Sequence, residues 1–384
     1  MTDENVERRR KADKRLFATM NADDERVSAR MEQIRAMNCT TPRDDLLRAH
    51  IKAMKRSLRT GDKEHRILFV TGESNAGKSR LVQNALAADP AFAPYEDDEG
   101  KGRPLLFGDA ASPCTQRNFA IRFLRKLGLP VRSNLQKTVA WPEMVNQICA
   151  HRVRFLVIDE AQRTMKINDD QELQEFSDNL ITLVDSKDWP IRVILIGVDP
   201  LDMLRKRDTQ MRNRSKRIKL FPIPSQKSAR VVLWLNEIIV DHAELSIIDL
   251  DLDDLARRLI RACDGNAGSI IELIRGAVEV VLWDGRSEVR SKDFAQAYVN
   301  RTSCLPHDNI FEMKKWEEIP VGAAKLRDTG DERGDAEDDI ETIKPLKKEN
   351  GHDEQAVPNR AVSPCKRPFP ASVHVWRPPT EFQA

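Results

Sequence analysis

The eight residues from Gly72 to Ser79 read GESNAGKS, which fits the pattern G-x-x-x-x-G-K-[ST]. The apolar run ILFVT precedes them and the amphipathic run RLVQNALA follows them. A loop of this kind between a strand and a helix presents backbone N–H groups and the positive end of the helix to phosphate oxygens. The sequence therefore predicts a phosphate-binding loop (P-loop).

Every position of the P-loop is a candidate for contact with the nucleotide: Gly72, Glu73, Ser74, Asn75, Ala76, Gly77, Lys78 and Ser79. The amino group of Lys78 is expected to reach the β- and γ-phosphates of ATP, and the hydroxyl of Ser79 is expected to ligate Mg²⁺. ATP and Mg²⁺ are therefore the expected cofactors.

A second motif lies further along the chain, where the apolar run FLVI ends in Asp159 and Glu160. Alone, such a pair is also compatible with a capped strand end. Beside a P-loop, Asp159 is expected to bind in the Mg²⁺ shell, and Glu160 to orient and deprotonate the attacking water. The two motifs together predict an enzyme that hydrolyses ATP, with Glu160 as a catalytic residue.

From Arg66 onward, apolar runs alternate with amphipathic segments. We expect strands at residues 67–72, 104–108, 154–160, 192–197 and 217–221. Short apolar strands separated by amphipathic helices form a parallel sheet that helices cover on both faces. The predicted fold class is α/β: a P-loop NTPase with a parallel sheet flanked by helices, plus a small helical domain.

Composition divides the chain into four regions. Residues 1–60 are charged, have apolar residues at helical spacing and contain no glycine, so we expect a helical region that ends at Gly61. Residues 61–225 form the nucleotide-binding domain. Residues 226–312 form a helical lid, with breaks at Asp264-Gly265 and Asp284-Gly285. Residues 313–384 are polar and rich in proline, and we expect a mostly disordered tail.

The strand expected at residues 192–197 is followed by Val198 and Asp199. In additional-strand ATPases this strand lies between the acidic strand and the P-loop strand, and its tip carries a polar residue that senses the γ-phosphate. Val198 has no polar side chain, so Asp199 is the side-chain candidate for this contact with the nucleotide. A plain turn after the strand is the alternative.

The net charge is only +2, so a nucleic-acid site has to come from local clusters of basic residues. The segment between Asp109 and Glu143 contains no acidic residue. On a helix over residues 115–127, four basic residues fall opposite an apolar face. We predict contacts with DNA phosphates, the alternative being a solvated basic surface. The candidates are Arg117, Arg122, Arg125, Lys126, Arg132 and Lys137.

The six cysteines are scattered, with no C-x-x-C pair and no spacing suited to a metal site. No segment approaches the ~18 consecutive apolar residues of a membrane span, and the N-terminus does not resemble a secretion signal. We expect a soluble, cytoplasmic protein with reduced thiols and no membrane partner.

Taken in order, the motifs resemble one family: the AAA+ ATPases of DNA transposition, of TniB/TnsC type and related to the phage MuB protein. The resemblance covers roughly residues 40 to 312. It is carried by the P-loop, ASPCTQRNFAIRFLRKLGLP, VIDEAQR, ILIGVDPLDMLRKRDTQMRNRSKRIKLFPIP, DGNAGSIIELIRGAVEVV and LPHDNIF. It implies an AAA+ fold with a small helical lid and a bacterial origin.

The resemblance also implies a function. Such ATPases assemble as ATP-dependent rings or filaments on duplex DNA without strong sequence preference, and they recruit or activate a transposase. A target-selection protein is a further expected partner, and the tail with Phe369 and Trp376 is a candidate docking peptide.

Two features concern the catalytic details. Against the family pattern, Arg214 in DTQMRNR is the expected arginine finger that reaches the ATP of a neighbouring subunit, with Arg212 as runner-up. The lid has Ala267 near where a phosphate-sensing arginine would sit, and Arg275 is a poor substitute by position. The departures from the family pattern at the strand tip, Val198-Asp199, and in the lid, Ala267, imply slow hydrolysis.

Two other functions fit the same motifs. One is a signalling ATPase of STAND type whose nucleotide state gates a protein partner without DNA. The other is a helicase-loader-like ATPase, which would bind single strands or replication proteins. No effector domain is visible in the sequence, which counts against the first.

Overall fold

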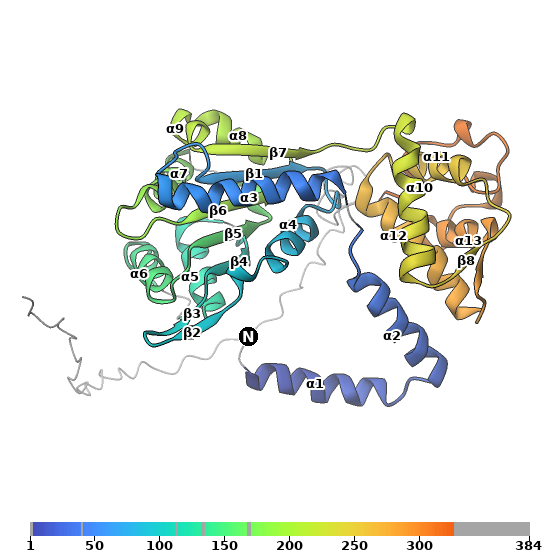
Figure 1. Cartoon of the computed structure of the whole chain (residues 1–384), viewed down its shortest axis with the longest axis horizontal. Helices are drawn as coiled ribbons and strands as arrows, with labels where there is room; N and C mark the ends of the chain where they lie inside the picture. Colours follow the sequence, from blue (N-terminus) through green and yellow to red (C-terminus); the bar gives the residue numbers. More distant parts are fainter. Residues whose placement is uncertain (1–2, 40, 113, 132–134, 167–169, 326–384) are drawn as a thin grey trace, which may run out of the picture. The chain divides into compact units, whose positions relative to one another are not determined.

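The computed structural model describes residues 3–39, 41–112, 114–131, 135–166 and 170–325 (Figure 1). Arg132 and the tail from residue 326, including Phe369 and Trp376, lie outside the described residues, so the predictions made for them stay predictions. None of the helices in the described ranges has both the length and the apolar character that a membrane span needs.

A five-stranded parallel sheet is the centre of the fold. Its strand order is β4-β5-β6-β1-β7. This order confirms the α/β class and the insertion of one strand between the acidic strand and the P-loop strand. The strands are β1 (Ile67–Gly72), β4 (Leu105–Asp109), β5 (Phe155–Asp159), β6 (Arg192–Gly197) and β7 (Ser215–Leu220).

Both faces of the sheet are buried, because successive side chains of a strand point to opposite faces. In β1, Ile67 and Phe69 belong to one hydrophobic cluster, and Leu68 and Val70 belong to another. The first cluster is covered by α5 (Gln116–Lys126), α6 (Lys137–Ala150), α7 (Asp170–Asp185), α8 (Leu201–Arg207) and α9 (Thr209–Asn213). The second is covered by α3 (Pro42–Thr60) and α4 (Lys78–Ala87).

The edge strand and one hairpin differ from the sequence prediction. Strand β7 begins at Ser215, two residues before the predicted start, because Ser215 and Lys216 are polar and do not extend an apolar run. A hairpin of β2 (Tyr95–Asp97) and β3 (Gly100–Gly102) was not predicted. The side chains of β2 are exposed, so no hydrophobic pattern marks it.

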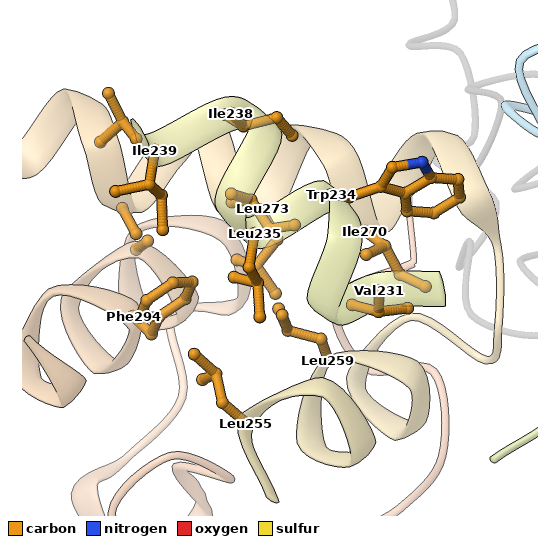
Figure 2. Close-up of a cluster of buried hydrophobic side chains, with 14 of the residues drawn as sticks. Val231, Trp234, Leu235, Ile238, Ile239, Leu255, Leu259, Ile270, Leu273 and Phe294 are labelled. Carbon is orange, nitrogen blue, oxygen red and sulfur yellow. The ribbon is translucent and has the colours of Figure 1, made fainter. Parts of the chain in front are cut away.

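The lid contains α10 (Ser228–Asn236), α11 (Leu252–Ala262), α12 (Ala267–Trp283) and α13 (Ser291–Thr302). Figure 2 shows its core, in which Leu235, Leu259 and Leu273 come together from three of these helices. The predicted breaks at Asp264-Gly265 and Asp284-Gly285 are confirmed. Two very short parallel strands, β8 (Ser246–Ile247) and β9 (Glu288–Val289), were not expected in this region.

Short helical turns complete the described chain. Five are 3-10 helices, η1 (Pro90–Phe92), η2 (Ala161–Lys166), η3 (Ser225–Lys227), η5 (Pro306–Asp308) and η6 (Trp316–Glu318). The other, η4 (Glu237–His242), is a π-helix that continues α10. The ordered chain extends beyond residue 312, where we placed the start of the tail, because Ile319 and Ala324 are buried in the lid core.

The N-terminal helices are α1 (Asp3–Phe17), α2 (Ala22–Ala36) and α3. As predicted, α3 ends at Gly61, which adopts the left-handed conformation with φ 72°. The buried residues of α2 join the lid cluster, whereas those of α3 join the sheet cluster. The described residues all belong to one compact unit, Met1–Glu332, and the boundaries drawn at residues 60, 225 and 312 remain predictions.

Candidate nucleotide-binding site

The P-loop connects the end of β1 to the start of α4. Gly77 occupies the N-cap of α4 in the left-handed conformation, φ 84°, and makes no side-chain cap hydrogen bond. The N–H groups of the first turn of α4 therefore have no capping side chain, which is the arrangement that suits a phosphate group. Lys78 is buried, and its Nζ donates to the carbonyl oxygen of Glu73 at 2.5 Å, across the loop.

A cavity of about 410 Å³ opens beside this loop. Six of the eight P-loop residues line it, together with Glu160 of the acidic motif. The P-loop residues in question are Ser74, Asn75, Ala76, Gly77, Lys78 and Ser79. Among the residues predicted to bind the nucleotide or Mg²⁺, Gly72, Glu73, Asp159 and Asp199 do not line it. The size and the phosphate-binding backbone fit a nucleotide.

Asp159 and Glu160 lie where β5 ends. The Oδ1 atom of Asp159 accepts a hydrogen bond from the backbone N–H of Glu160 at 2.9 Å. Glu160 has a φ of 54°, a conformation that non-glycine residues adopt rarely and that is found at functional sites. The described residues contain no cluster of three or more His, Cys, Asp or Glu that could hold a metal. Ser79 and Asp159 are the predicted Mg²⁺ ligands, and an ion of this kind commonly takes its remaining ligands from phosphates and water.

Gln162 is a polar residue of this site that the sequence analysis missed. Its Nε2 donates to Oε2 of Glu160 at 3.0 Å, and its Oε1 accepts from the backbone N–H of Val198 at 3.3 Å. A side chain at Gly197 would meet Oε1 of Gln162 at only 2.5 Å. Gln162 thus connects the tips of β5 and β6. Its position two residues after Glu160 in the sequence was the signal that could have identified it.

Asp199 turns away from the cavity. Its Oδ2 lies 2.8 Å from Nζ of Lys219 on β7, and the residue is exposed. The residue of this strand tip that lines the cavity is Val198. The sensor role of Asp199 remains a prediction, and its ion pair with Lys219 does not favour it.

The sequence analysis did not predict the cavity-lining residues that come from outside the P-loop and the acidic strand. The segment between α2 and α3 forms one wall, and the lid helices α10 and α12 form another. These residues include Met37, Asn38, Cys39, Thr41, Trp234, Ile271 and Arg275. Burial raises the pKa of the Cys39 thiol to about 12, so this thiol is neutral at pH 7. Apolar and aromatic residues of this kind suit a nucleotide base.

Arg275 lines the cavity from α12, but its guanidinium is held by other groups. Its Nη1 lies 2.8 Å from Oε1 of Glu272, and its Nη2 donates to the carbonyl oxygens of Ile34 and Met37. These contacts connect the lid to the end of α2. Arg275 therefore acts as a structural link between α2 and α12.

The two finger candidates differ in their surroundings. Arg214 contacts Asp185 through Nε at 2.7 Å and Nη2 at 2.6 Å, and this hydrogen bonding raises the pKa of the guanidinium. Arg212 lies in α9 and is exposed, with no ion pair to any residue of the described ranges.

The predicted basic face of α5 is present, and its residues have partners within the chain. Arg122 forms an ion pair with Asp109, and Nζ of Lys126 lies 3.8 Å from the same carboxylate. Arg117 and Arg125 donate to the carbonyl oxygens of Leu135 and Val131. On α6, Lys137 lies 2.5 Å from Glu175. The opposite face of α5 is buried as predicted, with Phe119, Phe123 and Leu124 inaccessible to solvent.

Comparison with known proteins agrees with this geometry. Residues 59–204, which run from the end of α3 to α8, match the model of the family described as AAA domain. The chain contains an AAA-family ATPase domain. The protein is an ATPase, and its AAA domain carries both the P-loop and the acidic strand. No curated protein sequence matches the chain.

Solved structures resemble the ATPase in fold. The ORC2 protein of Aeropyrum pernix, in its ADPNP–ADP complexes, is 16% identical with a TM-score of 0.51 and covers 72% of this chain and 74% of its own. The ORC1 protein of Aeropyrum pernix in complex with DNA is 16% identical with a TM-score of 0.49, and 71% of each chain is covered. Cdc6p of Pyrobaculum aerophilum is 13% identical with a TM-score of 0.49, covering 68% of this chain and 67% of its own. The ORC2 likeness supports an AAA+ P-loop NTPase fold.

Proposed function

We propose that this ATPase is a bacterial, cytoplasmic regulator of DNA transposition that assembles on duplex DNA with ATP and recruits or activates a transposase. The sequence resemblance to the TniB/TnsC type supports the transposition role. The DNA role is carried by one structural observation, a series of ion pairs that connects the basic face of α5 to the candidate catalytic Glu160.

This series runs through Asp109 at the end of β4. Its carboxylate binds Arg122 and Lys126 of α5 on one side. On the other side, Nη1 of Arg163 lies 3.8 Å from Oδ2 of Asp109, and Nη2 of Arg163 lies 3.6 Å from Oε2 of Glu160. All five side chains are between one third and one half exposed, so phosphate groups have access to the cations.

DNA phosphates would compete with Asp109 for Arg122 and Lys126. Asp109 would then interact more strongly with Arg163, and the attraction between Arg163 and Glu160 would weaken. Glu160 would be freer to orient water at the γ-phosphate. DNA binding would in this way stimulate hydrolysis, and the affinity for DNA would decrease steeply with salt and depend little on base sequence.

For the hydrolytic step we propose the following roles. The N–H groups of the P-loop and Lys78 bind the phosphates, and Ser79 and Asp159 would hold Mg²⁺, which would supply positive charge beside the phosphates. Glu160 accepts the proton of the attacking water, and Gln162 fixes the Glu160 carboxylate. Arg212, rather than Arg214, is the better candidate for the finger in trans because its guanidinium is exposed.

Sedimentation with ATP or a non-hydrolysable analogue, with and without plain duplex DNA, tests this function. We expect large assemblies only when nucleotide and duplex are both present, and none with the Lys78→Ala variant. A protein that stays monomeric and hydrolyses ATP independently of DNA would contradict the proposal and favour a signalling switch. Assembly on single strands alone would favour a helicase-loader-like protein. If the duplex assembly forms, its stimulation of a candidate transposase is the next measurement.

A further inference from the structure

The turn between α11 and α12, together with the first residues of α12 up to Gly268, is in contact with two other parts of the ATPase. Gly265 has a φ of 66°, and its carbonyl oxygen accepts a hydrogen bond from the N–H of Ile223 at 2.8 Å. A side chain at Gly265 would lie 2.4 Å from the carbonyl oxygen of Ile223. Ile223 belongs to the segment that leads from β7 into the lid. The turn is thus fixed on the connecting segment.

Asn266 connects the same turn to the P-loop. Its Nδ2 donates to the carbonyl oxygen of Ser74 at 2.8 Å, while its Oδ1 caps α12 by accepting from the N–H of Ser269 at 3.1 Å. The residue is only 2% exposed. The buried side chain of Asn266 therefore accepts a hydrogen bond from the lid helix and donates one to the P-loop.

Gly268 brings the first turn of α12 against the next residue of the P-loop. A Cβ at this position would lie 2.0 Å from the carbonyl oxygen of Asn75 and 3.1 Å from its carbonyl carbon. No side chain fits at that distance. Asn75 itself is left-handed, with a φ of 57°, a conformation that costs a non-glycine residue free energy unless its surroundings hold it.

An ion-pair network also connects the turn and the P-loop. Nζ of Lys325 lies 2.6 Å from Oε2 of Glu73 and 3.2 Å from Oδ2 of Asp264. Three successive P-loop residues, Glu73, Ser74 and Asn75, are therefore each contacted by the turn or by the segment that follows the lid helices.

We propose that Asn266 and Gly268 are positioning residues that hold Ser74 and Asn75 of the P-loop in the conformation that binds nucleotide phosphates. The lid then sets the nucleotide affinity through backbone contacts with the P-loop, without a phosphate-sensing arginine at Ala267 or Gly268. This inference rests on nucleotide binding at the P-loop and is independent of DNA binding and of transposition.

The two functions of Asn266 can be separated by mutation. Serine caps a helix about as well as asparagine does, but its short hydroxyl cannot reach Ser74. Asn266→Ser should therefore leave the thermal stability close to that of the wild type and weaken ATP binding by about tenfold or less, the usual range for one buried hydrogen bond. Asn266→Ala loses the cap as well, so its Tm should be lower while its affinity resembles that of Asn266→Ser.

Gly268→Ala has a matched control on the same helix. Alanine stabilises a helix more than glycine does, so if the close contact with Asn75 did not matter, Gly268→Ala would have an equal or higher Tm and an unchanged affinity. We expect instead at least tenfold weaker ATP binding, because the lid cannot approach Asn75. At Gly276 of α12 an added Cβ makes ordinary contact with Ala297 at 3.5 Å, so Gly276→Ala should bind ATP like the wild type.

Titration of each full-length variant with a fluorescent ATP analogue measures these affinities, with Lys78→Ala as the non-binding reference and circular dichroism as the check of folding. Weaker binding by Asn266→Ser and Gly268→Ala, but not by Gly276→Ala, supports the inference. Unchanged affinity in Asn266→Ser overturns it while leaving the ATPase assignment intact. A wild-type protein that binds no better than Lys78→Ala overturns both the site and the inference.

Discussion

Arg214 is bound to Asp185 within its own chain, with Nε and Nη2 at 2.7 and 2.6 Å from the same carboxylate oxygen. Arg66 pairs with the other oxygen of that carboxylate. An arginine finger has to leave its own subunit to reach the ATP of a neighbour. Arg214 would have to break this partly buried ion pair to do so, whereas Arg212 would not.

We therefore expect Arg212→Ala to abolish most assembly-dependent hydrolysis, by a factor of about 10³ as for other arginine fingers. Arg214→Ala should reduce stability more than turnover. ATPase rates measured against protein concentration, with duplex DNA present, will check this. Mixing Arg212→Ala with Glu160→Gln subunits provides a control, because each would supply the group that the other lacks and some activity should return. If Arg214→Ala alone removes the assembly-dependent rate, the assignment to Arg212 is wrong.

The Asp185 ion pairs also predict a pH dependence. Burial raises the pKa of this carboxyl, but hydrogen bonds from Arg214 and Arg66 outweigh burial and hold the pKa below the ordinary value of 3.8. A lowered carboxyl pKa contributes stability above pH 3.8 that is lost as the pH decreases through the lower folded-state pKa. Arg214→Ala should thus unfold at a higher pH than the wild type in an acid titration followed by circular dichroism. Arg212→Ala, which leaves Asp185 paired, should unfold at the wild-type pH.

We expect mutations of Gln162 and Asp199, which follow strands β5 and β6, to have different effects on catalysis. Gln162 holds Glu160, so Gln162→Ala should lower kcat by about tenfold or more, with little change in KM. Asp199 pairs with Lys219 outside the cavity, so Asp199→Ala should change neither constant by more than about twofold. Steady-state kinetics of both variants, beside Glu160→Gln as the reference for a lost base, separates the two. A large effect of Asp199→Ala alone would restore Asp199 as the sensor.

Asp109 and Arg122 should affect DNA binding in opposite directions. Arg122→Ala removes a phosphate contact, so it should weaken duplex binding and reduce the salt slope by about one. Asp109→Asn removes the carboxylate that competes with DNA, so it should strengthen binding. Fluorescence anisotropy over a series of salt concentrations measures both. Lys315→Ala, at a highly exposed lysine of the lid region, is the control and should have no effect. Equal affinity in Asp109→Asn and wild type would argue against the basic face of α5 as the DNA site.

The sequence predicted the parts of this fold that depend on local pattern. Strands β1 and β6 begin and end where their apolar runs do, because both faces of these strands are buried. The hairpin β2-β3 has no such pattern, since its first strand is exposed. The P-loop was visible because phosphate binding requires particular residue types at fixed positions within the loop, and the acidic pair because it directly follows an apolar run.

The partners of charged residues could not be predicted in the same way. Asp185 and Arg214 come from α7 and from the residue before β7, and Asp109 and Arg163 come from β4 and η2. Only the folded sheet brings such pairs together. For the same reason the acid-free segment after Asp109 suggested an uncompensated basic surface, although Asp109 itself binds two of its cations.

The consecutive helices α2 and α3 pack in different parts of the fold: α2 belongs to the lid core and α3 to the sheet core. The polypeptide therefore crosses between lid and sheet twice, once between Met37 and Thr41 and once through Pro222 to Pro224. A fragment that starts at residue 61 would keep only the second of these crossings, and it would lose the part of the lid core that Val27, Met31 and Ile34 of α2 supply.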